Sequence, residues 1–185
     1  MPFREVARTR RPATWGIGAS TDRLCDIYVG VSAYPVSAVL HREWAPDLSP
    51  QRLYALLRLR VDVFVVEQDC PYPELDGRDL EQGTRHFWIE SESDPDLPSA
   101  CLRLLEEPGG GFRIGRVCTA AGARGRGLSR RLMEAALADI GAADAVLDAQ
   151  AQVAGLYATF GFERDGEEFV EDGIPHVTMR RPAKR

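Results

Sequence analysis

The stretch Gly122-Ala-Arg-Gly-Arg-Gly-Leu-Ser129 decides how the rest of this chain is interpreted. Before it, residues 112–118 alternate between apolar and polar side chains, which predicts a strand. After it, apolar side chains between 128 and 140 recur at helical spacing. A glycine-rich turn between a strand and a helix leaves backbone N–H groups free at the helix start, where the helix dipole favours negative charge. The layout therefore predicts a site for phosphate groups.

The spacing of this loop excludes two common phosphate-binding motifs. A P-loop reads G-x-x-x-x-G-K-S/T, and Gly122 and Gly127 have the required separation. Leu128 stands where the lysine must be, however, and leucine cannot reach a transferring phosphate. A dinucleotide-binding loop reads G-x-G-x-x-G, and counting from Gly125 its third glycine is replaced by Arg130. Neither an NTPase nor a dinucleotide-binding enzyme is expected.

The segment Arg124-Gly-Arg-Gly127-Leu-Ser129 resembles the pyrophosphate loop of GNAT acyl-CoA N-acyltransferases, Arg/Gln-x-x-Gly-x-Gly/Ala. Ser129 departs from the usual Gly or Ala, but serine is small enough to let the backbone approach a phosphate. The resemblance implies acetyl-CoA as co-substrate. It also implies that the preceding strand binds pantetheine and polarises the thioester carbonyl through backbone N–H groups. The implied cofactor-binding residues are Val117, Cys118, Thr119, Arg124, Gly125, Arg126, Gly127, Leu128, Ser129 and Arg130.

A second segment, Leu156-Tyr-Ala-Thr-Phe-Gly-Phe162, resembles the L-Y-x-x-x-G-F sequence of the same superfamily. The tyrosine of that sequence lies near the CoA sulfur, so Tyr157 is the candidate general acid for the leaving thiolate. A phenol with an ordinary pKa of about 10 is protonated at neutral pH, as an acid must be. The alternative is a half-buried helix residue whose hydroxyl is hydrogen-bonded.

Five further stretches are similar to the ElaA-like branch of GNAT acetyltransferases. They are 53–60, 63–72, 76–77, 84–86 and 171–176, and the resemblance covers residues 38–181. It implies an α/β fold with a mixed, mostly antiparallel central sheet of six or seven strands flanked by helices. It also implies direct transfer of an acetyl group from acetyl-CoA to a primary amine of a small molecule or peptide, and a homodimer is a further expectation.

The general base that takes the proton of the acceptor amine is left open among three residues. Glu67 begins an acidic, turn-rich stretch, and a carboxylate can act as a base directly or through water. A solvated charge or a helix-end salt bridge is the alternative for Glu67. His86 and His176 are the imidazole candidates and the candidate acceptor-binding residues. A satisfied histidine at a strand edge is the alternative for His86, and a structural hydrogen bond is the alternative for His176.

Length and composition set the broader limits. The chain has 185 residues, 44% hydrophobic and 28% charged, with a net charge of −5. This composition predicts a globular domain over residues 38–185, preceded by a poorly defined N-terminal extension over residues 1–37. The acidic balance argues against nucleic acid, and the absence of any apolar run of 18 residues argues against a membrane span. No metal-ligand spacing of Cys or His occurs, so no metal site is expected.

The cysteines and the acidic stretch each allow two interpretations. Free thiols in the cytoplasm are the default, and Cys118 is expected to be structural because no nearby basic group would activate it as a nucleophile. The acidic residues between 67 and 81 either attract a cationic acceptor or form a solvated loop face. A different function is also open, in which the same fold binds acetyl-CoA as a sensor without turnover.

The expected secondary structure follows the apolar periodicity. Strands are predicted at 38–44, 87–89, 100–105, 112–118 and 145–149, with a closing hairpin from 162 to 179. Helices are predicted from Pro50, with Ser49 as N-cap, to Phe64, then over 128–140 and 153–160.

Overall fold

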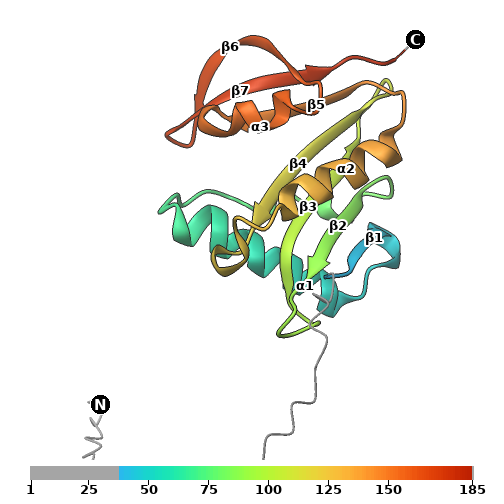
Figure 1. Cartoon of the computed structure of the whole chain (residues 1–185), viewed down its shortest axis with the longest axis vertical. Helices are drawn as coiled ribbons and strands as arrows, with labels where there is room; N and C mark the ends of the chain where they lie inside the picture. The colour runs from blue at the N-terminus through green and yellow to red at the C-terminus, as the bar shows by residue number, and fades with distance from the viewer. Residues whose placement is uncertain (1–37, 185) are drawn as a thin grey trace, which may run out of the picture. The chain divides into compact units, whose positions relative to one another are not determined.

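A seven-stranded sheet organises residues 38–184, the part of the chain that the computed structural model describes (Figure 1). The spatial order is β1-β2-β3-β4-β5-β7-β6. Every neighbouring pair is antiparallel except β4 and β5, which run parallel. The predicted mixed, mostly antiparallel sheet is therefore confirmed. The strands are β1 (Leu40–Trp44), β2 (Arg85–Glu90), β3 (Pro98–Glu106), β4 (Phe112–Thr119), β5 (Ala145–Gln150), β6 (Glu163–Glu171) and β7 (Ile174–Arg181). The expected N-terminal extension, residues 1–37, lies outside the described residues.

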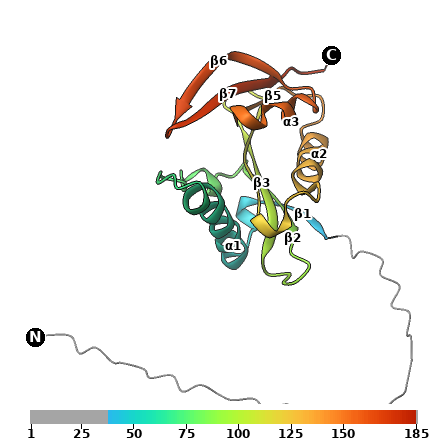
Figure 2. The same cartoon turned by 60° about the vertical axis from the view of Figure 1, so that its left-hand side comes forward.

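Three α-helices cover the sheet: α1 (Pro50–Arg60), α2 (Leu128–Ile140) and α3 (Ala154–Ala158). α1 begins as predicted, because the Ser49 hydroxyl accepts the backbone N–H of Arg52 at 3.1 Å. α1 lies on one face of the sheet and α2 on the other (Figure 2). None of the helices in the described part of the chain has both the length and the apolar composition that crossing a membrane requires.

The apolar core lies on both sides of β3. Leu132 and Met133 of α2 pack against the strand side chains Leu102, Ile114 and Leu147. On the opposite face, helix α1 and its extension pack against Trp88, Cys101 and Cys118. The central strands β2 and β3 are buried on both faces, and their buried residues include the polar side chains of Arg85, His86 and Arg103 as well as apolar ones.

Two helix boundaries differ from the sequence prediction. α1 ends at Arg60, and the chain continues to Glu67 as a π-helical segment (Val61–Glu67), which periodicity at 3.6 residues could not reveal. The predicted helix over 153–160 is shorter: a 3₁₀ turn over Ala151–Val153 leads into α3. The chain then turns at Gly161, whose φ of 84° is favourable only for glycine.

The parallel pair β4 and β5 separates soon after it forms. Only Phe112 pairs with Ala145 and Arg113 with Val146, and beyond them the two strands diverge. A bulge in β4 accompanies the separation: Arg116 has a φ of 56°, and the pairing register with β3 shifts between Cys101 and Arg103. A bulge bends its strand and increases the local twist. The result is an opening in the middle of the sheet.

A buried ionic network holds the long connection between the π-helical segment and β2. The Arg60 guanidinium donates to Glu74 and to Asp79, each at 2.5 Å. Arg103 donates to both carboxylate oxygens of Asp76 at 2.7 and 2.6 Å. Arg60 is 1% exposed, so the network fixes this connection against the sheet instead of leaving it solvated. The expected alternative of a solvated acidic face is wrong for Glu74 and Asp79, which are both buried.

Candidate functional site

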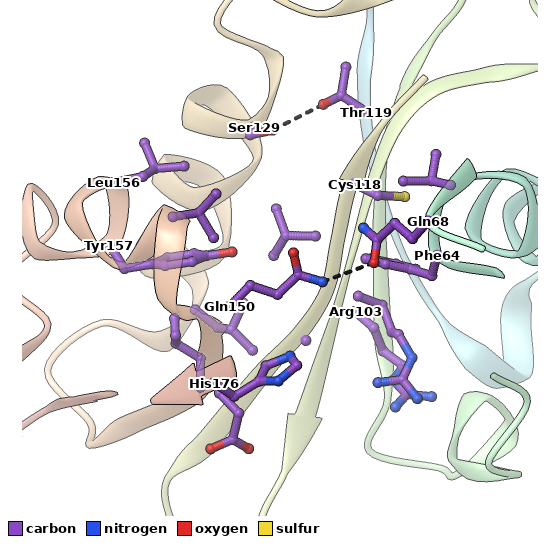
Figure 3. A pocket seen from close by; sticks show the side chains of 18 of the residues that line it. Phe64, Gln68, Arg103, Cys118, Thr119, Ser129, Gln150, Leu156, Tyr157 and His176 are labelled. Carbon is purple, nitrogen blue, oxygen red and sulfur yellow. Dashed lines mark hydrogen bonds between the residues drawn. The ribbon is translucent and has the colours of Figure 1, made fainter. Parts of the chain in front are cut away.

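The opening between β4 and β5 forms a cleft of about 940 Å³ (Figure 3). The glycine-rich loop and the N-terminus of α2 close one end of the cleft. The β6–β7 hairpin and the connection after the π-helical segment border the other end, while β4, β5 and α3 line the middle. Segments that are far apart in the sequence therefore contribute to one continuous space.

The glycine-rich loop presents an unprotected helix N-terminus to the cleft. Gly127 precedes α2 with a φ of 73°, and no side chain caps the first turn. Gly125 has a φ of 75°, and a Cβ placed on either glycine would meet no atom within 4 Å. The first-turn N–H groups are thus free for an anion. The Thr119 and Ser129 hydroxyls lie 3.0 Å apart and join the end of β4 to the start of α2.

Most of the loop residues predicted to bind the cofactor line the cleft. These are Arg124, Gly125, Gly127, Leu128, Ser129 and Arg130. Arg126 is the exception, because its side chain pairs with Glu92 and borders a separate hollow of about 360 Å³. Its side chain therefore lies away from the cleft.

The end of β4 offers backbone donors to the cleft. The N–H of Ala120 donates to the Ser99 carbonyl of β3 at 2.9 Å. Because N–H direction alternates along an antiparallel strand, the N–H groups of Val117 and Thr119 face away from β3, toward the opening. Val117, Cys118 and Thr119 all line the cleft.

Cys118 is a structural thiol. Its Sγ lies 3.5 Å from the Sγ of Cys101, its cross-strand partner. The hydrogen bond with Cys101 and burial raise the pKa of the Cys118 thiol well above its ordinary value. A thiol that resists ionisation is a poor nucleophile, which supports the expectation that Cys118 forms no acyl intermediate.

Tyr157 projects its hydroxyl into the middle of the cleft (Figure 3). The side chain is 8% exposed, and no hydrogen-bond partner of the hydroxyl occurs among residues 38–184. Burial, with a smaller electrostatic contribution from Cys118, raises the pKa of Tyr157 to about 12. The phenol therefore stays protonated at neutral pH and has no internal partner competing for its proton.

Two of the three candidate bases do not line the cleft. Both oxygens of the Glu67 carboxylate accept from the Arg124 guanidinium, at 2.6 and 2.7 Å. This hydrogen bonding lowers the pKa of Glu67. His86 is buried in β2, and its Nε2 lies 3.0 Å from the Asp79 carbonyl oxygen. Burial lowers the pKa of His86. The expected strand-edge position of His86 is wrong, because β2 lies between β1 and β3.

His176 is the candidate base that does line the cleft. Its Nδ1 lies 2.8 Å from the Ile174 carbonyl oxygen, and its ring stacks on Phe169 with 5.9 Å between centroids. On the other side, His176 is the direct register partner of Gln150 in β5. The sequence pattern alone gave no reason to choose His176 over His86.

Two glutamines that the sequence analysis missed meet across the cleft. Gln150 Nε2 of β5 donates to Gln68 Oε1, just beyond the π-helical segment, at 3.0 Å (Figure 3). Gln152 Nε2 in turn donates to Gln150 Oε1 at 2.9 Å. Gln68 lies within the ElaA-like stretch 63–72, which assigns it no role, and Gln150 belongs to no motif. The two residues lie 82 positions apart, so only the tertiary structure brings them together.

The arginines at the far end of the cleft are already paired with carboxylates. Arg103 is bound by Asp76, Arg116 by Glu74 at 2.8 Å, and Arg113 by Asp148 at 2.6 Å. The paired guanidinium groups offer no free cation for an anionic group, and the exposed carboxylates of Glu171 and Asp172 also line this end of the cleft. Within residues 38–184 no group of His, Cys, Asp and Glu side chains is arranged to hold a metal ion.

The family model described as an acetyltransferase (GNAT) domain matches residues 45–182. The chain belongs to the GNAT acetyltransferase family. Its relatives include the UPF0039 protein Rv2851c of Mycobacterium tuberculosis, 58% identical over 151 residues, which are 80% of this chain and 95% of that protein. Protein ElaA of Escherichia coli is 37% identical over 139 residues, 73% of this chain and 90% of ElaA.

Solved structures agree with this assignment. An acyl-CoA N-acyltransferase from Pseudomonas aeruginosa has a TM-score of 0.74 at 41% identity, covering 78% of this chain and 99% of that one. The crystal structure of Escherichia coli ElaA has a TM-score of 0.72 at 35% identity, with the same coverage. The predicted ElaA-like branch is thereby confirmed. Acyl transfer from an acyl-CoA is consistent with this membership.

Proposed function

We propose that the protein is an N-acetyltransferase that transfers an acetyl group from acetyl-CoA directly to a primary amine of a small molecule or peptide. The observation that carries the proposal is that three groups needed for acetyl transfer meet in one cleft. It joins an uncapped helix N-terminus, free backbone donors on a splayed strand and an unpartnered tyrosine hydroxyl. These are the groups that hold a pyrophosphate, polarise a thioester and protonate a thiolate.

The pyrophosphate of acetyl-CoA would lie at the start of α2. The first-turn N–H groups donate to its oxygens, and the αL glycines allow the backbone to approach closely. The pantetheine arm would then run between β4 and β5. There it adds hydrogen bonds to the free edge of β4 in place of the missing strand pairing.

The reacting thioester would lie between the end of β4 and Tyr157. The backbone N–H groups of Val117 and Thr119 are the available donors for the carbonyl oxygen, which gains negative charge as the amine attacks. Tyr157 then donates its proton to the departing CoA sulfur. The thiols of Cys70, Cys101 and Cys118 are free, which supports a reducing compartment such as the cytoplasm as the place of action.

Calorimetric titration with acetyl-CoA, CoA and ATP tests the first half of the proposal. We expect acetyl-CoA and CoA to bind one saturable site and ATP to bind weakly or not at all. Release of the CoA thiol is then followed with a panel of primary amines: propylamine, spermidine, Nα-acetyl-lysine, a short peptide and kanamycin. Tight CoA binding without release above the blank for any amine would instead favour an acetyl-CoA sensor.

A further inference from the structure

Direct transfer needs a group that takes a proton from the acceptor. A primary alkylamine resembles the lysine side chain, with a pKa of about 10.4, so it reaches the cleft mostly as an ammonium ion. An ammonium nitrogen has no lone pair for attack on a thioester. A base within reach of this nitrogen must therefore remove a proton first.

The chain has three histidines, and the rings of two of them form contacts outside the cleft. His41 stacks on Trp88 with 4.9 Å between centroids, and its Nε2 lies 2.8 Å from Glu90. His86 is buried, and its Nε2 lies 3.0 Å from the Asp79 carbonyl oxygen. Neither ring lines the cleft, and the carboxylate of Glu67 is occupied by Arg124 outside it. Glu171 and Asp172 do line the cleft, but both are exposed residues at the β6–β7 turn, whereas the His176 ring is partly buried.

The hydrogen bond to Ile174 fixes the state of the His176 ring. A carbonyl oxygen can only accept, so Nδ1 must carry the hydrogen in this 2.8 Å contact. In the neutral ring the lone pair then belongs to Nε2, the nitrogen farther from the backbone. Nε2 has no hydrogen-bond partner within the described part of the chain, and the ring lines the cleft.

We propose that His176 is the general base of the reaction and that its Nε2 takes the proton from the acceptor ammonium. This assignment rests on the proposed function. Stacking on Phe169 restrains the plane of the His176 ring. Strand pairing with Gln150 places this residue beside the hydrogen bond between Gln150 and Gln68. In Figure 3 the Tyr157 hydroxyl and the His176 ring approach the cleft from different elements, with Gln150 between them. The group that protonates the CoA sulfur, Tyr157, and the group that deprotonates the acceptor nitrogen, His176, are thus separate side chains.

The proton transfers balance with these two groups in place. His176 takes one proton from the ammonium and passes it to bulk water. The free amine attacks the carbonyl carbon, a C–N bond forms, and the C–S bond breaks as Tyr157 protonates the sulfur. The nitrogen then loses its second proton to the Tyr157 phenolate, which restores the phenol. The net products are the N-acetyl amide, CoA thiol and one proton.

Nitrogen NMR on histidine-labelled protein tests the required state directly. The chain contains three imidazole rings, and His176→Asn and His41→Asn variants assign two of the three spin systems. We expect the neutral ring of His176 to carry its hydrogen on Nδ1. A ring protonated at Nε2 would overturn the proposal, because that nitrogen would then have no lone pair to offer.

Kinetics with two probe amines test the role. Asparagine at 176 places an amide N–H close to the position of Nδ1, so it keeps a donor for Ile174 while removing the basic nitrogen. Propylamine is protonated at neutral pH, whereas methoxyamine is already neutral. We expect His176→Asn to lower kcat/KM for propylamine by about 100-fold or more and for methoxyamine by less than about tenfold. His41→Asn is the matched control and should change neither, and both variants should bind CoA like the wild type.

The outcomes separate this assignment from the proposed function. Equal losses with both probes, or full activity of His176→Asn with propylamine, would overturn the role of His176 alone. No thiol release by the wild-type protein with either probe or with the amine panel would overturn the proposed acetyl transfer, and this assignment with it.

Discussion

Replacing Gly127 with aspartate should abolish CoA binding while leaving the domain folded. The residue has a φ of 73°, where a side chain costs about 1–2 kcal/mol in backbone strain. A Cβ at this position meets no atom within 4 Å, so no steric clash adds to this cost. For a domain of this size, the strain corresponds to a fall in Tm of roughly 2–8 °C.

The loss in affinity has a different origin and is larger. A carboxylate about 5 Å from a pyrophosphate charge is repelled by about 3 kcal/mol at an effective dielectric constant of about 20. This alone corresponds to a more than 100-fold weaker Kd, since about 1.4 kcal/mol is one factor of ten. The side chain also occupies the space through which the backbone approaches the phosphate, which adds to the loss.

Calorimetry and thermal unfolding measure the two effects separately. Gly109→Asp is the matched control: Gly109 has a φ of 96°, its Cβ position is equally open, and it lies in the turn before β4, away from the loop. We expect a similar loss of Tm in both variants, but loss of CoA binding only in Gly127→Asp. Wild-type affinity in Gly127→Asp would refute the assignment of this loop to the pyrophosphate.

Three further predictions concern catalysis, acid stability and the core. Tyr157→Phe should lower kcat by about 10- to 1000-fold with little change in CoA affinity, and an equal loss of binding would mark Tyr157 as a packing residue. Burial raises the pKa of Asp76 and Asp79, but hydrogen bonds and charge from Arg103 and Arg60 outweigh it and hold both values below the ordinary value of about 3.9. A carboxyl whose pKa is lower in the folded protein than in the unfolded chain stabilises the fold at pH values above the unfolded pKa. The urea midpoint of unfolding should therefore fall as the pH drops below about 4. A midpoint that stays constant down to about pH 3 would contradict this. Leu132→Ala truncates a side chain that is 0% exposed and should lower the free energy of unfolding by about 2–5 kcal/mol, measured by urea denaturation. A loss below about 1 kcal/mol would contradict the position of Leu132 in the core.

Local chemistry explains why much of the fold could be predicted from the sequence. Ser49 and Pro50 start α1, and the apolar spacing of 128–140 predicts α2 with both boundaries correct. The role proposed for the loop from Arg124 to Ser129 depends on backbone conformation and helix position, and both follow from short-range sequence. For the same reason, the loop and Tyr157 could be named as candidate site residues from contiguous motifs, and the structure places both at the cleft.

The choice among the candidate bases depended on contacts that no local pattern encodes. Glu67 is occupied because Arg124, 57 positions away, folds back to it, and His86 is excluded because β2 pairs on both sides. His176 has an available nitrogen because its own strand turn satisfies the other one, at an opening created by the bulge at Arg116. Short-range sequence patterns were sufficient to predict the family, most of the strands and helices, and the glycine-rich turn between β4 and α2. Which titratable side chains face the cleft could be read only from the folded chain, because hydrogen-bond partners and strand separation are properties of long-range packing.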